Sequence, residues 1–193
     1  ECNKVVHSEL SHFADQIKFD YAIVKLDRSV AGIGEPVAIR QERVFLGENL
    51  TLIGNSLGLP TKIDSDGIVV FEGSDENDYF SLQVDMFHRG SGSPLFDTEG
   101  KLVGIGVRGG VDFDSADECM KTRTVDSSTR YFEEAGYANE ALIRSGFSHL
   151  VNIDGEKDNS GSVDHDNNCS AINVSSNRET VVKLVLLLLS NNI

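Results

Sequence analysis

A serine at a glycine-rich bend is the residue of this sequence best suited to chemistry. Ser91 stands between Gly90 and Gly92, and Ser93-Pro94 follow it. Because glycine adopts tight and left-handed backbone readily, such a segment can expose the serine hydroxyl and set backbone N–H groups beside it. That geometry stabilises the oxyanion that forms when a hydroxyl attacks an acyl carbon. The pattern predicts that Ser91 is a nucleophile.

Short apolar runs separated by turn residues must position this loop. The runs are rich in β-branched and aromatic residues, and Gly, Asn, Asp and Ser stand between them. Short strands with frequent turns favour a β-barrel or a β-sandwich. A serine among glycines also occurs at the nucleophile turn of α/β-hydrolases, but that fold needs helices that alternate with strands, which the sequence lacks. We expect strands at 19–26, 44–46, 50–53, 67–71, 79–84, 94–96 and 102–107.

The C-terminal part of the chain contains a helix signal, then a polar stretch, and then a short apolar run. Asn139 to Gly146 predicts one short helix, with Asn139 as a candidate N-cap and Gly146 as its end. Residues 151–193 are mostly polar and without periodicity, which predicts a linker, until the apolar run Val181–Leu189. That run is shorter than the roughly 20 residues that cross a bilayer as a helix, so we expect no membrane span.

Composition excludes several classes of protein. The chain has 193 residues, the size of one domain, and a net charge of −14, which repels nucleic acid and anionic lipid. Three cysteines exclude a dense disulfide framework and leave one bridge open. The sequence begins at Glu1 without a basic and then apolar leader, and we expect the native N-terminus to lie further upstream.

One segment of the tail has the spacing of oxygen-bearing residues that a metal site needs. Residues 156–167 can be aligned with an EF-hand loop, whose alternate oxygens wrap calcium. Glu156 and Asn167 are poor ligands for the first and last positions, and no helices flank the segment. We interpret it as solvated linker and predict no metal site.

The segment from Gly90 to Ile105 resembles the nucleophile loop of chymotrypsin-fold serine peptidases. In that family Gly-Asp/Asn-Ser-Gly-Gly/Ser-Pro leads into an apolar strand, a turn and an apolar-Val-Gly-Ile strand, and residues 90–105 follow this order. Asp20–Leu26, which reads Asp-Tyr-Ala-Ile-Val-Lys-Leu, is similar to the aspartate segment of the family. Leu50–Pro60 is similar to a stretch of its bacterial trypsin-like and glutamyl endopeptidase-like members.

The resemblance implies an all-β, chymotrypsin-like double β-barrel with a short C-terminal helix. Residues 1–29 would form the last strands of an incomplete first barrel, and residues 30–150 would form the second barrel with the nucleophile loop and the helix. Residues 151–193 would be the linker and the apolar tail. It also implies a secreted or periplasmic serine endopeptidase that acts on protein or peptide substrates and uses no cofactor.

The catalytic roles of the family match individual residues of this chain. Ser91 would attack the peptide carbonyl, and Asp20 would accept the Nδ1–H of the catalytic histidine and orient it. The backbone around Arg89, Gly90 and Ser91 would form the oxyanion hole.

The same resemblance implies a substrate-binding set. Asp85 lies six residues before Ser91, at the position that forms the floor of the primary pocket in trypsin-like members, where a carboxylate would select Arg or Lys side chains. The rival interpretation of Asp85 is a structural carboxylate that caps a turn. His88 would lie on the rim of the substrate cleft. Val107 and Gly109 would lie on the strand whose backbone pairs with an extended substrate.

Two positions of the loop depart from the family pattern. Arg89 replaces the family glycine two residues before the nucleophile, and Gly90 replaces the Asp or Asn directly before it. A Cβ at residue 89 restricts the backbone conformation that aims an N–H at the oxyanion. Arg89 would then either block the oxyanion hole or project outward toward substrate.

The catalytic histidine has no match in this sequence. Only nineteen residues precede Asp20, so His7 and His12 do not stand where the family has its base, and we interpret both as surface residues. We expect the histidine upstream of Glu1. The alternative is a catalytically inactive, protease-like binding module that keeps the fold without the base.

Overall fold

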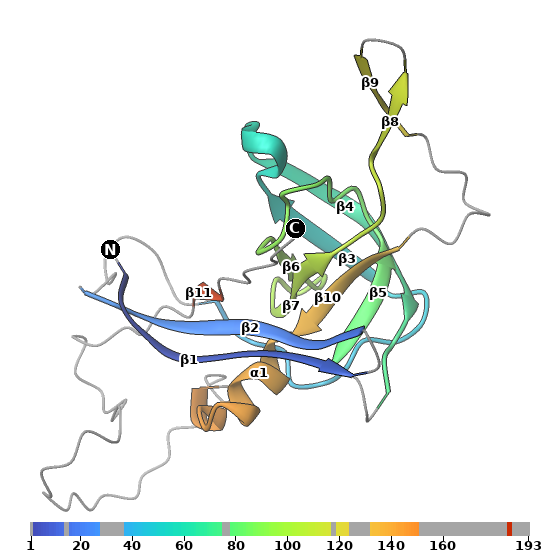
Figure 1. Cartoon of the computed structure of the whole chain (residues 1–193). Coiled ribbons are helices and arrows are strands. Elements are labelled where there is room, and N and C mark those ends of the chain that lie inside the picture. Colours follow the sequence, from blue (N-terminus) through green and yellow to red (C-terminus); the bar gives the residue numbers. More distant parts are fainter. Residues whose placement is uncertain are drawn as a thin grey trace, which may run out of the picture.

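The structure, a computed structural model, describes residues 2–13, 16–27, 37–74, 78–116, 119–123, 132–150 and 185–186. Most of these residues lie in β-strands (Figure 1). Six strands close into a barrel in the order β10-β5-β4-β3-β6-β7. The strands are β3 (Asn49–Gly54), β4 (Lys62–Phe71), β5 (Tyr79–Gln83), β6 (Pro94–Phe96), β7 (Leu102–Arg108) and β10 (Glu133–Tyr137).

The remaining elements flank the barrel. A three-stranded antiparallel sheet has the order β1-β2-β11, with β1 (Cys2–Phe13), β2 (Gln16–Leu26) and β11 (Val185–Leu186). A second hairpin, β8 (Phe113–Ala116) with β9 (Cys119–Thr122), projects away from the barrel (Figure 1). The helix α1 (Ala138–Arg144) follows β10 directly, and two short 3₁₀ helices are η1 (Ser56–Gly58) and η2 (Ser148–Leu150).

Two apolar clusters hold these elements together. The first fills the barrel and includes Phe80, Leu95 and Tyr137, which are almost fully buried. The second joins the β1–β2 hairpin to the barrel and the helix, and includes Tyr21 of β2, Val107 of β7 and Leu142 of α1. Burial of each such side chain contributes roughly 1.5–3 kcal/mol to folding. The strand that carries Asp20 is thereby packed on the same core as β7.

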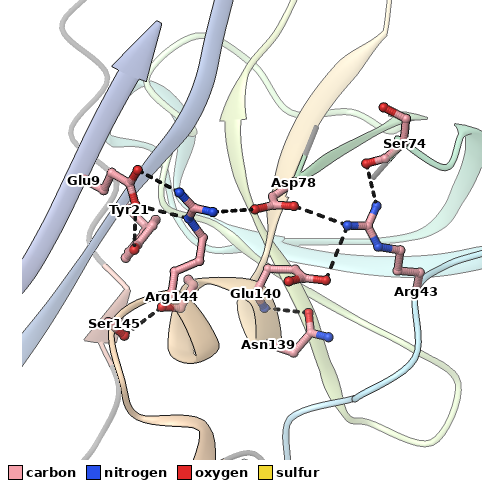
Figure 2. A network of polar contacts seen from close by, with 10 residues as sticks. Glu9, Tyr21, Arg43, Ser74, Asp78, Asn139, Glu140, Arg144 and Ser145 are labelled. Carbon is pink, nitrogen blue, oxygen red and sulfur yellow. Dashed lines mark hydrogen bonds and ion pairs between the residues drawn. The ribbon is translucent and has the colours of Figure 1, made fainter. Parts of the chain in front are cut away.

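A polar network adds a second connection between the hairpin and the barrel (Figure 2). The Arg144 guanidinium donates to Glu9 of β1 at 3.0 and 3.2 Å and lies 3.7 Å from Asp78. The hydroxyl of Tyr21 donates to the same Glu9 at 3.0 Å. Hydrogen bonding by Arg144 lowers the pKa of Glu9, and burial raises the pKa of Tyr21 to about 12. Arg43 contacts Asp78 from the other side at 3.2 Å.

The predicted helix is present, but its proposed cap is wrong. The helix begins at Ala138, with Tyr137 as the N-cap residue, so Asn139 lies inside the first turn. Asn139 is buried, and its Nδ2 donates to the carbonyl of Gln41 at 2.6 Å, which ties the helix to the chain before the barrel. Gly146, with φ of +81°, ends the helical segment as predicted.

Most predicted strands are confirmed with small changes of bounds, and the all-β class with one short helix is confirmed. The predicted strand at 44–46 is absent, because the Glu48 carboxylate accepts the Phe45 N–H at 3.0 Å and folds this segment into a turn. Strands β8, β9, β10 and β11 were not predicted, and β1 lies in the region expected to hold strands but was not given bounds. The predicted tail at 151–193 lies outside the described residues except for Val185–Leu186. No helix in the described part of the chain is long and apolar enough to cross a membrane.

Candidate active site

The loop that carries Ser91 connects β5 to β6, and its last residues, Ser91, Gly92 and Ser93, are hydrogen-bonded to β7. The Ser91 hydroxyl donates to the carbonyl of Val107 at 2.8 Å. The N–H of Gly92 donates to the carbonyl of Gly106 at 2.8 Å, and the N–H of Gly106 donates to the carbonyl of Ser93 at 2.8 Å. These bonds fix the half-buried Ser91 side chain against the C-terminal end of the barrel strand β7.

Gly90 stands where the family carries Asp or Asn, and the packing explains the difference. A Cβ at this position would lie 2.7 Å from the Phe87 carbonyl oxygen and 2.8 Å from both the Met86 Cγ and the Ser56 hydroxyl oxygen. The Gly90 carbonyl accepts two hydrogen bonds from Ser93, one from its hydroxyl at 2.6 Å and one from its N–H at 3.1 Å. No side chain fits here without a shift of the loop.

Arg89 adopts the backbone conformation that favours glycine. Its φ is +65°, in the left-handed region, which costs a non-glycine residue roughly 1–2 kcal/mol. Its side chain is exposed. None of the described residues accepts a hydrogen bond from its backbone N–H. The Cβ of Arg89 therefore does not prevent the left-handed turn before the serine, and this donor remains available to a ligand.

A cavity of about 420 Å³ opens beside Ser91. One wall is formed by residues 86–89 of the loop and the other by residues 108–112 at the end of β7. Phe113 and Met120 of the β8–β9 hairpin and Glu133 of β10 complete the lining. The rings of Phe87 and Phe113 stack with centroids 6.0 Å apart. Most of the exposed lining is apolar, and the charged residues in it are Arg89, Arg108, Asp112 and Glu133.

Glu133 is the site residue that the sequence analysis missed. Burial raises the pKa of its carboxyl to about 8, and the negative charge of Asp112 adds to the effect, while a hydrogen bond from the Gly110 backbone lowers the pKa. A Cβ on residue 109 would overlap the Glu133 carboxylate, so Gly109 leaves the space that this carboxylate occupies. The only sequence signal was an acidic pair, Glu133-Glu134, separated by four residues from the start of the predicted helix at Asn139.

Asp85 does not line the cavity. Its side chain is 53% exposed and forms an ion pair with Lys62, and its backbone N–H donates to the Asp64 carboxylate at 2.8 Å. His88 and Gly109 do line the cavity. His88 is exposed, and its backbone N–H donates to Asp112 at 2.6 Å. The assignment of Asp85 to substrate binding stays a prediction.

The side chains of Asp20 and His7 lie on different faces of the β1–β2 hairpin. Asp20 is only 8% exposed. Neighbouring residues of a strand point to opposite faces, so the Asp20 side chain lies opposite that of Tyr21. The ring of His7 stacks on Tyr21 at 5.7 Å and therefore faces away from Asp20. His7 is partly exposed, and the side chain of His12 lies outside the described residues, so the interpretation of both as surface residues stays a prediction.

Comparison with known families decides the membership of the chain. The model of the trypsin-like peptidase domain matches residues 3–105, which is more than half of the chain and includes both Asp20 and Ser91. The chain belongs to this family. A mostly β trypsin-like peptidase domain with one closed six-stranded barrel fits the chymotrypsin-like double barrel that the sequence predicts. Family membership also supports a serine peptidase with peptide substrates.

Two solved structures that are similar to this chain are forms of one protease. The inactive form of the Rv3671c protease is 14% identical with a TM-score of 0.41, and the match covers 69% of this chain and 70% of that one. The active form of the same protein, from M. tuberculosis, is 16% identical with a TM-score of 0.38 and coverages of 73% and 62%. None of the curated proteins compared with the chain gives a significant match.

Proposed function

We propose that this protein is a serine endopeptidase that works by a Ser-His-Asp mechanism. The Ser91 oxygen adds to the peptide carbonyl carbon while a histidine takes the hydroxyl proton and then passes it to the leaving amine. Water hydrolyses the resulting acyl-enzyme by the same steps in reverse. Asp20 holds the histidine ring in the required tautomer. The observation that carries the proposal is the Ser91 hydroxyl, which is held on β7 at the edge of a cavity.

The oxyanion hole is the second part of the proposal. As the tetrahedral intermediate forms, the N–H groups of Arg89 and Ser91 donate to its negatively charged oxygen. The left-handed conformation of Arg89 and the unused donor of its N–H support this role. Loss of one such donor costs about 100- to 1000-fold in turnover. The Arg89 side chain is exposed.

Substrate is proposed to bind as an additional strand. An extended peptide pairs with the backbone after Val107, near Gly109, and places one side chain in the cavity beside Ser91. We propose a preference for a basic residue before the cleaved bond, in an enzyme that acts outside the cytoplasm.

A non-catalytic protein-binding module is the second candidate. The observation that favours it is the position of His7, whose ring stacks on Tyr21 and faces away from Asp20. Such a module would keep the cavity and the substrate-pairing strand without turnover. The two candidates differ in the reactivity of Ser91.

The test is covalent labelling of the full-length protein with a fluorophosphonate. Reaction needs an activated serine, so the enzyme would be labelled and would hydrolyse peptide substrates, and Ser91→Ala would lose both. Ser93→Ala is the matched control, because Ser93 is a buried neighbour that bonds within the loop, and it should still be labelled. Absence of labelling under conditions where trypsin reacts would support the binding module.

A further inference from the structure

The charged side chains around the cavity differ in whether they form ion pairs. Asp85 is paired with Lys62 at the surface. Arg108, whose side chain lines the cavity, is paired with Glu134. Asp112 accepts the backbone N–H of His88. Glu133 faces the cavity with a hydrogen bond from the Gly110 backbone, and it forms no ion pair with any described residue.

From this arrangement we infer that Glu133, and not Asp85, selects the substrate side chain that enters the cavity, and that it selects a cation. The inference rests on the proposed function, because it takes the cavity beside Ser91 as the primary specificity pocket. The negative charge of this pocket then comes from Glu133 of β10, a strand far along the chain from the nucleophile loop. Asp85, exposed and ion-paired, then holds the edge of the loop.

The shape of the cavity fits an arginine or lysine side chain. Met86, Phe87, Phe113 and Met120 provide apolar walls that can pack against an aliphatic stem. The Glu133 carboxylate lies over Gly109 and can pair with the charged end of that stem. A substrate strand paired near Gly109 would bring its side chain to this carboxylate. Because Glu133 is half-buried, its ionised carboxylate has lost part of its hydration, which costs free energy. A bound cation offsets that loss by pairing with the carboxylate.

Cation binding is therefore coupled to loss of a proton from Glu133. With its pKa near 8 the empty pocket holds Glu133 largely neutral at pH 7, and a cation within hydrogen-bond distance lowers the pKa of a carboxyl. Affinity for a cation should rise with pH until Glu133 is ionised in the free protein. Other charged or titratable groups also face this region. They are Asp85, His88 and Arg89 of the nucleophile loop, Arg108 of β7, Asp112 before β8 and Glu134 of β10.

The experiment measures binding of 4-aminobenzamidine, a fluorescent aromatic amidinium that mimics an arginine side chain. Binding needs neither a nucleophile nor a histidine. We expect the wild-type protein to bind it about 10- to 100-fold more tightly at pH 9 than at pH 6, the range expected for a hydrogen bond to a charged group. Glu133→Gln should lose a similar factor at pH 9 and bind with little dependence on pH. Asp85→Asn, the matched control, should stay within about threefold of wild type.

Three results would overturn the inference. They are no amidinium binding by the wild-type protein at pH 9, equal affinity for the neutral analogue 4-aminobenzamide, and a loss of affinity in Asp85→Asn with Glu133→Gln unchanged. The first two use the wild-type protein, so they do not depend on whether a variant folds. The protein could bind the amidinium while Ser91 fails to react with fluorophosphonate. That result would contradict the peptidase proposal but would support the assignment of Glu133.

Discussion

The nucleophile loop and the β1–β2 hairpin supply the two ends of the proposed catalytic site, and they are held in different ways. The loop is bonded to β7 through backbone groups and through the Ser91 hydroxyl, so its position follows from the barrel itself. Within the described residues the hairpin pairs with no barrel strand, and it is attached through apolar packing and the network on Arg144. Side-chain substitutions should therefore move Asp20 more easily than Ser91.

The largest expected effect concerns the barrel region and its buried carboxyl. The pKa of Glu133 in the folded protein, about 8, lies above its value of 4.5 in the unfolded chain, so the folded state binds the extra proton between these values. The free energy of unfolding should fall as pH rises from about 4.5 through 8. Glu133→Gln should remove this decline and be more stable than wild type by up to about 4 kcal/mol at pH 9. Urea unfolding at pH 5 and pH 9 measures the difference.

A difference between the two proteins that is the same at pH 5 and pH 9 would contradict the buried position of the carboxyl. Glu134→Gln is the control on the neighbouring residue. Glu134 is ion-paired with Arg108, so its variant should show no gain of stability at high pH.

Next in size is the effect of a side chain at Gly90. A methyl group there would press on the Phe87 carbonyl, the Met86 side chain and the Ser56 hydroxyl, so Gly90→Ala should destabilise the fold by roughly 1–3 kcal/mol. Thermal unfolding measures this cost. Gly47→Ala is a useful comparison, because its left-handed φ is costly but no atom lies near its Cβ position. A fully stable Gly90→Ala variant would show that the loop is not packed as described.

Arg144→Ala tests the attachment of the hairpin. It removes the contacts with Glu9 and Asp78, which are partly exposed, and should lower the global stability by only about 1 kcal/mol. Hydrogen exchange should rise in β1 and β2 and stay unchanged in β6 and β7. A rise spread equally over the barrel would contradict the division into two regions.

The smallest expected effect on stability comes from Arg89→Gly. Glycine relieves the left-handed strain but gains entropy in the unfolded chain, so the net gain should be about 0.5–1 kcal/mol. The rate of fluorophosphonate labelling should not fall, because the N–H donor is retained. A large drop in this rate would assign the Arg89 side chain a direct role with the substrate.

The sequence predicted the parts of this molecule that depend on local signals. Pro94–Phe96 has its predicted bounds because turns delimit it on both sides, and Gly146 ends the helix by its left-handed backbone. β10 was missed because Glu133–Gly136 has low strand propensity, and it forms a strand by pairing with both β5 and β7. That long-range pairing also places Glu133 in the cavity, which no motif around Ser91 could indicate.

Peptide mapping of the fluorophosphonate adduct by mass spectrometry is the most direct test of the central claim, that Ser91 is an activated nucleophile. The account predicts that the full-length protein gains a single phosphonyl group and that the modified fragment places it on Ser91. An adduct on Ser93 or another residue, or an unmodified protein after a trypsin standard has reacted completely, would contradict it.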